Sequence, residues 1–173
     1  MDPEIIPLSS PDWDAKNPAA SFRAFADHIH GRARAMFMKD GFHAEMLFFL
    51  PLDGKGHIVL VRGGDRDRQA EWTKRHIAEH YTYGIVHVVE AWMRLAARPK
   101  DPVMRQIMDG EIKVSELREE DRKECLLVSA QTRDGHRTTW VNEILRDKGG
   151  GKPTLAPSLA FTDSEGRFGS LFG

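Results

Sequence analysis

The chain has 173 residues, of which 40% are hydrophobic and 29% are charged, and its formal net charge is −1. A chain of this length buries roughly 70% of its unfolded surface, so it can form one domain without a disulfide or a structural metal. Basic and acidic residues are intermixed, which argues against nucleic-acid binding, because that function needs a basic face that displaces counterions from phosphates.

Membrane and secretory functions are also disfavoured by the pattern of the chain. No apolar run approaches the roughly 18 residues of a membrane span, and the acidic start lacks the basic and apolar blocks of a secretory signal. Cys125 is the single cysteine, which excludes an internal disulfide. We therefore expect a cytoplasmic protein that binds no membrane.

The first strong element is a helix that follows a proline-rich arm. Residues 1–17 contain Pro3, Pro7 and Pro11, which predicts an extended arm. Asn17 and Pro18 then form a good helix start, with asparagine as the N-cap. Apolar side chains recur at helical spacing from there to a stop at Asp40-Gly41. The candidate anchors of the arm are Ile5, Ile6 and Trp13, and the helical stripe is Phe22, Phe25, Ala26, Ile29, Ala33, Met36 and Phe37.

A hairpin, a second helix and a buried strand come next. Residues 43–50 and 57–61 are apolar runs that flank a glycine-containing turn, which favours two strands of a hairpin. Asp65 or Asp67 can cap a helix that runs to about Tyr83 and stops at Gly84. Residues 85–95 are apolar on both faces, as in a central strand, and the strand-helix-strand order predicts that this strand runs parallel to 57–61.

The rest of the chain predicts a surface excursion, a hairpin and an edge strand. Residues 96–123 are rich in proline and charge, which indicates an excursion with one or two short helices. Strands 125–132 and 138–145 flank Asp134-Gly135, a typical hairpin dipeptide. Residues 154–161 can form only an edge strand because of Pro157, and the polar tail from residue 162 is expected to be flexible.

These elements predict an α+β fold with a mixed, mostly antiparallel sheet and two main helices. The expected order is α-β-β-α-β-β-β, with a possible extra edge strand. The expected organisation is an arm at 1–17, one domain at 18–161 and a flexible tail at 162–173.

One pentapeptide has the spacing of a metal site. In His76-Ile77-Ala78-Glu79-His80, two histidines four residues apart share one helical face, and Glu79 could polarise a metal-bound water. The H-x-x-E-H string resembles the zinc motif of the inverzincin metallopeptidases. That resemblance implies that His76 and His80 bind zinc, that Glu79 is the general base, and that a later glutamate on another helix is the third ligand. The structural alternative is an ordinary helix face, and no cofactor beyond a divalent metal such as zinc is expected.

The same helix predicts an interface. Trp72, His76 and Tyr83 fall on one side of it, opposite a core face that includes Ile77, and aromatic side chains are enriched in interface cores. The other members expected on the core face are Thr73, His80 and Tyr81. The alternative is that the helix is buried on both sides.

Glu90 is the remaining candidate for chemistry. On a central strand it would be partly buried, and desolvation would raise its pKa towards that of a general acid or base. His87 points to the opposite face, because side chains alternate along a strand, so the two cannot form a dyad. The alternative is an ion pair with an arginine or a place near water at the strand end.

Two functions remain open at this level. The first is a non-catalytic binding or accessory protein that contacts a protein partner or a second copy of itself. The second is a small hydrolase that uses His76, Glu79 and His80 with a metal, or an enzyme that uses Glu90 as acid or base. The glycine pair at 63–64 and the three glycines at 149–151 lack the residues of phosphate-binding or dinucleotide-binding loops.

Overall fold

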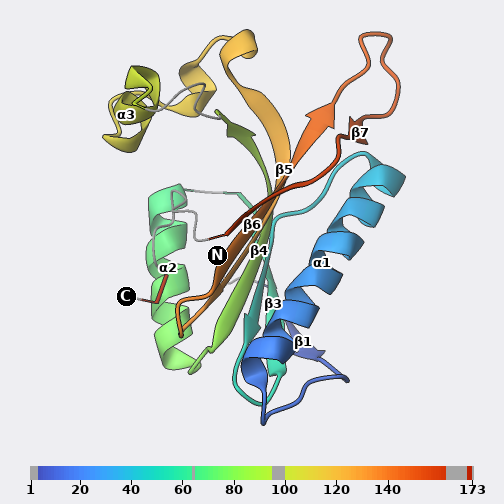
Figure 1. Cartoon of the computed structure of the whole chain (residues 1–173), viewed down its shortest axis with the longest axis vertical. Helices are drawn as coiled ribbons and strands as arrows, with labels where there is room; N and C mark the ends of the chain where they lie inside the picture. The colour runs from blue at the N-terminus through green and yellow to red at the C-terminus, as the bar shows by residue number, and fades with distance from the viewer. Residues whose placement is uncertain (1–3, 64, 95–99, 163–170, 173) are drawn as a thin grey trace.

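The computed structural model describes residues 4–63, 65–94, 100–162 and 171–172, and its centre is one antiparallel sheet (Figure 1). The strands are ordered β1-β3-β2-β4-β5-β6, and both β7 and β8 pair with β6. They are β1 (Glu4–Ser9), β2 (Met46–Leu50), β3 (Lys55–Leu60), β4 (Gly84–Met93), β5 (Lys123–Thr132), β6 (Arg137–Leu145), β7 (Thr154–Leu155) and β8 (Leu159–Thr162).

Helix α1 (Pro18–Asp40) covers one face of the sheet and α2 (Arg66–Glu79) covers the other (Figure 1). This arrangement confirms the predicted α+β class with two main helices. Strands β3 and β4 run in the same direction, as the strand-helix-strand order predicts, but β2 lies between them and pairs antiparallel with each.

The predicted arm contributes a strand. Residues 4–9 form β1, which pairs with β3. Ile5 and Ile6 are exposed, so Trp13 is the anchor: its indole N–H donates to the Leu52 carbonyl at 2.8 Å. Gly54 allows this contact, because a Cβ there would lie 2.3 Å from the Trp13 ring and its φ of +71° is unfavourable for other residues.

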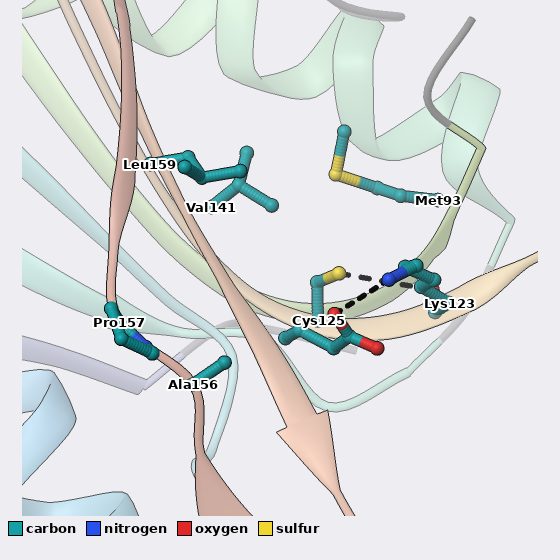
Figure 2. Close-up of a pocket in the computed structure, with 8 residues that line it drawn as sticks. Met93, Lys123, Cys125, Val141, Ala156, Pro157 and Leu159 are labelled. Carbon is teal, nitrogen blue, oxygen red and sulfur yellow. Dashed lines mark hydrogen bonds and ion pairs between the residues drawn. The ribbon is translucent and has the colours of Figure 1, made fainter. Parts of the chain in front are cut away.

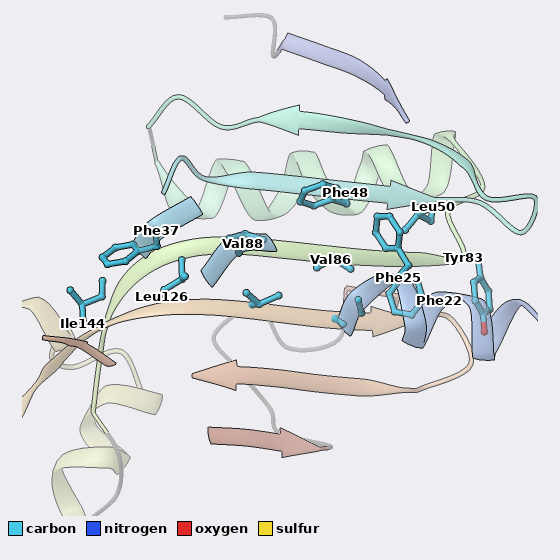
Figure 3. Close-up of a cluster of buried hydrophobic side chains, with 14 residues drawn as sticks. Phe22, Phe25, Phe37, Phe48, Leu50, Tyr83, Val86, Val88, Leu126 and Ile144 are labelled. Carbon is cyan, nitrogen blue, oxygen red and sulfur yellow. The ribbon is translucent and has the colours of Figure 1, made fainter. Parts of the chain in front are cut away.

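Helix α1 begins and ends where its capping residues predict. The Asn17 side chain accepts from the backbone N–H of Ala20, and Gly41 closes the helix in the left-handed conformation at φ 78°. Its buried stripe packs on alternate residues of β2, β4 and β5 in the larger of two apolar clusters (Figure 3). Met36 is the exception in the stripe, because its side chain is 38% exposed.

Helix α2 is shorter than predicted. Asp65 caps its start, but the helix ends at Glu79, and Tyr81 takes a positive φ of 49°. Gly84 is therefore not the helix stop but the first residue of β4, where a Cβ would lie 2.3 Å from the ring of Phe22. From Gly84 to Val89 strand β4 is buried on both faces, as expected for a central strand.

The second half of the chain follows the predicted order. The excursion contains α3 (Pro102–Met108) and two short 3₁₀ turns at Val114–Glu116 and Glu119–Asp121. The hairpin of β5 and β6 turns at Asp134-Gly135, and Pro157 separates β7 from β8. No helix in the described ranges is long and apolar enough to cross a membrane.

The predicted flexible tail is packed at its described end. Leu171 is only 7% exposed and belongs to the second apolar cluster, on the α2 side of the sheet. Residues 163–170 and 173 lie outside the described residues, so the flexibility of the tail as a whole stays a prediction.

Candidate functional site

Three histidine rings meet where the end of α2 crosses β3. His76 lies on α2, His80 follows its last residue, and His57 projects from β3. The ring centroids of His76 and His80 are 4.1 Å apart, those of His57 and His76 are 4.8 Å apart, and those of His57 and His80 are 5.4 Å apart. We call these three residues the histidine cluster.

Local geometry explains why the rings converge. His76 and His80 share a helical face because they are four residues apart. His57 points towards α2 because it lies two residues from the buried Val59, which belongs to the cluster under that helix. The strand partner of His57 is Phe49, so the two side chains stand on the same face of the sheet.

Aromatic rings support two of the three histidines. Phe49 stacks on His57 with centroids 5.1 Å apart, and Trp72 stacks on His76 at 4.6 Å. The edge of the Phe49 ring also meets His76 at 4.6 Å. His76 is buried, whereas His80 is exposed. The cluster therefore has a packed floor and one side that faces solvent.

The environment favours neutral imidazoles. Burial, with smaller contributions from the charges of His80 and His57, lowers the pKa of His76 to about 4. Burial and the charge of His80 also lower the pKa of His57. Both rings are therefore neutral at pH 7, which is the protonation state that binds a metal ion.

The spacing of the ligand atoms is close to that of a metal site. His57 Nε2 and His76 Nε2 are 2.5 Å apart and form a hydrogen bond in which one ring donates to the other. The Glu79 carboxylate and the ring nitrogens of His76 and His80 lie within 4.8 Å of one another. Two nitrogens on a tetrahedral zinc ion are about 3.3 Å apart. The set of His76, Glu79 and His80 is therefore close to the spacing of metal ligands, and His57 adds a third imidazole in contact with His76.

The structure does not place Tyr83 on α2 beside Trp72 and His76, as the predicted aromatic interface requires. Tyr83 lies beyond the helix, on the opposite face of the sheet, where it is 7% exposed and meets Phe22 edge-on at 6.3 Å (Figure 3). Burial, and then its hydrogen bond to Asp134, raises the pKa of Tyr83 to about 12. Trp72 is partly buried against His76 and Phe49.

The predicted core face of α2 is correct only in part. Thr73 and Ile77 are buried, but His80 and Tyr81 are exposed, because the helix has already ended. Action through a protein partner or self-association stays a prediction, and Tyr83 is buried on the other face of the sheet and cannot contribute to the surface assigned to it.

Glu90 forms a hydrogen bond with the segment that follows α1. Its carboxylate accepts the backbone N–H of His43. It lies on the α1 face of the sheet, whereas His87 lies on the α2 face and donates to Glu45 at 2.8 Å. The expected separation of Glu90 from His87 is therefore observed, and the described contacts of Glu90 indicate a structural role.

Sequence reasoning missed a partly buried polar network around Glu45 at the start of α2. One oxygen of Glu45 accepts from Arg66 at 2.6 Å, from Gln69 at 2.7 Å and from His87 at 2.8 Å. Burial alone would raise the pKa of Glu45, but the hydrogen bonds from His87 and Gln69 and the charges of His87 and Arg66 lower it overall. These residues come from three separate segments of the chain, so no short sequence pattern predicts the network.

A second polar group on the α1 face was also missed. The fully buried Asn142 accepts from Arg34 at 2.6 Å and from His30 at 3.2 Å, and it donates to the carbonyl of Leu126 at 3.0 Å. Ser158 also donates to it, which ties the segment before β8 to α1. We call His30, Arg34, Asn142 and Ser158 the asparagine cluster.

A hollow of about 280 Å³ lies beside Cys125 (Figure 2). Apolar side chains line most of it, and Lys123 pairs with Glu143 at 2.7 Å on its wall. Burial, and then the charge of Glu143, raises the pKa of the Cys125 thiol to about 11. The thiol is therefore protonated at neutral pH and is a poor nucleophile.

Comparison with protein-family models, curated proteins and solved structures found no match to this chain.

Proposed function

We propose that this protein binds a divalent transition-metal ion of the zinc class through His57, His76 and His80. The observation that carries the proposal is the meeting of three imidazoles, two of them held neutral by burial, at centroid distances of 4.1 to 5.4 Å. Imidazole nitrogen suits zinc, copper and nickel ions. His57 would take the place of the distant glutamate that the inverzincin resemblance implies.

Metal-assisted hydrolysis is a second candidate, favoured by the position of Glu79. Closed structural zinc sites have four protein ligands, whereas catalytic sites have three and bind water in the fourth position. Glu79 is exposed and its carboxylate lies within 4.8 Å of the ring nitrogens of His76 and His80. From there it could accept a proton from a metal-bound water.

A zinc titration of chelator-treated protein tests the metal proposal. We expect one Zn²⁺ per chain, and we expect His57→Ala and His76→Ala each to weaken binding about 100-fold, because each removes one of three ligands. His28→Ala is the matched control, since His28 is exposed on α1. Binding that is unaffected by the His57 and His76 substitutions would contradict the proposal.

Hydrolysis is tested separately with zinc-loaded protein and p-nitrophenyl acetate. We expect Glu79→Gln to retain zinc within a few-fold but to lose about 100-fold in turnover, which is the usual contribution of a general base. Turnover equal to that of free zinc would leave a metal-binding protein without hydrolytic activity.

A further inference from the structure

The packing under α2 joins the histidine cluster to residues 171–172. The apolar cluster under this helix contains Phe49, Ile77 and Leu171, with Phe172 packed at its border. The backbone N–H of Leu171 donates to the Gln131 side chain at 3.3 Å. These residues thus belong to the same packed layer as the rings that support the histidines.

Phe172 has a contact of its own at this border. The guanidinium of Arg133 lies 5.7 Å from the centre of its ring, within the range of a cation–π interaction. Arg133 also donates to the carbonyl of Thr82, in the segment between α2 and β4. Phe172 is therefore fixed next to the end of the helix that presents His76 and His80.

Helix α2 has few apolar contacts of its own. Over its 14 residues it buries only Thr73, His76 and Ile77, so Ile77 is its one buried aliphatic side chain. A helix held by so few contacts depends on neighbouring segments for its position. Leu171, which is 7% exposed, fills space in the cluster that contains Ile77.

Leu171 and His57 flank α2 on different sides. His57 belongs to β3, whereas Gln131, which binds the backbone of Leu171, belongs to β5. Strands β2 and β4 lie between these two strands, and Phe49 of β2 contacts both His57 and His76. A change at Leu171 would therefore reach the histidines through Ile77 and Phe49.

We infer that Leu171 and Phe172 are positioning residues for the metal site, which set its affinity by holding α2 against Phe49 and its neighbours in the sheet. This inference rests on the proposed metal binding. It predicts that metal binding and the docking of residues 171–172 strengthen each other, because coupling between two sites is reciprocal.

Substitutions at the two positions test the inference by zinc titration under conditions in which each variant is fully folded. We expect Leu171→Ala to weaken zinc binding about tenfold, Phe172→Ala about threefold, and Leu171→Met to remain within twofold of the parent. Leu159→Ala is the matched control, because Leu159 is 52% exposed on β8. It should leave the affinity unchanged.

Two further readouts separate positioning from general stability. Cobalt(II) reports coordination geometry through its visible absorption, so Leu171→Ala should change that spectrum and Leu171→Met should restore it. In the parent protein, zinc should slow hydrogen exchange at the Leu171 amide. The decrease in exchange rate should be about as large as the loss of zinc affinity in Leu171→Ala, because the coupling is reciprocal.

The outcomes distinguish the two proposals. If the parent protein binds zinc through the histidine cluster and Leu171→Ala binds it equally well with an unchanged cobalt spectrum, the positioning role is wrong and the metal site stands. If the parent binds no zinc, both proposals are overturned. A tenfold loss in Leu171→Ala that Leu171→Met restores supports both.

Discussion

Replacing Asn142 with alanine should strongly destabilise the fold. The substitution removes one hydrogen bond to the Leu126 carbonyl and leaves Arg34, His30 and Ser158 without their shared acceptor. Ordinary hydrogen bonds contribute about 1 kcal/mol each, and those to charged groups about 1.5 to 3 kcal/mol. Arg34 is partly exposed and can regain water, which reduces the loss. We therefore expect a decrease of roughly 3 to 4 kcal/mol in the free energy of unfolding.

Urea unfolding of Asn142→Ala, Ser158→Ala and the double variant measures this effect. The double-mutant cycle should give a coupling of about 1 kcal/mol, since the two side chains share a hydrogen bond. Asn17→Ala is a useful reference, because it removes an exposed helix cap worth about 1 kcal/mol. If Asn142→Ala costs no more than Asn17→Ala, the asparagine cluster does not hold β8 to α1 as argued.

Three further predictions concern glycine, thiol and carboxyl positions. Gly31→Ala should stabilise the protein by roughly 0.5 to 1 kcal/mol, because the added Cβ meets nothing within 4 Å on α1. Gly84→Ala should instead destabilise it by about 2 kcal/mol or more, because the added Cβ would lie 2.3 Å from the Phe22 ring. Urea unfolding of the two variants measures both changes. Cys125 should react with a disulfide reagent at pH 8 about 100-fold more slowly in the native state than in urea, since its pKa is raised from 9.0 to about 11; equal rates would contradict its burial. The pKa of Glu45 is lowered below its ordinary value of 4.5, so its contribution to stability is present above that pH and is lost as the pH falls through the folded-state pKa. The stability advantage of the parent over Glu45→Gln should therefore be constant above pH 4.5 and should shrink as the pH falls below it in urea titrations, and a constant difference at all pH values would refute this assignment.

The sequence predicts the helix ends and turns that are determined by a few neighbouring residues. The Asn17 cap, the apolar stripe and Gly41 define α1 within a few neighbouring residues, and Asp134-Gly135 defines a hairpin in the same way. The end of α2 was not predictable by these rules, because Tyr81 takes a positive φ without being glycine or asparagine. That error also placed Tyr83 on the helix instead of in the core.

The sequence predicts two of the three histidines of the candidate site, His76 and His80, but not His57. The spacing of His76 and His80 is a local signal, and their proximity in space follows from helix geometry alone. His57 is 19 residues away from His76 and reaches it only because β3 pairs with β2 beneath α2. Likewise, Leu171 looked like part of a polar tail, and its burial depends on the space that the sheet and α2 leave between them.

The two groups of buried polar side chains differ in a way that bears on function. In the asparagine cluster, each described donor finds an acceptor, which is what a structural network requires. In the described part of the chain, the hydrogen bonds of the histidine-cluster rings are limited to the one between His57 and His76.

Among the described residues, no ring nitrogen of the histidine cluster is both buried and without a hydrogen-bond partner, so the open side of the cluster leaves the remaining nitrogens accessible to a ligand. Sequences depart from the rules of core packing chiefly at functional sites. A metal ion that entered from the open side would bind lone pairs that stay unprotonated because burial lowers the pKa of His57 and of His76. The meeting of accessible, unprotonated imidazole nitrogens therefore favours a ligand-binding role over a purely structural one.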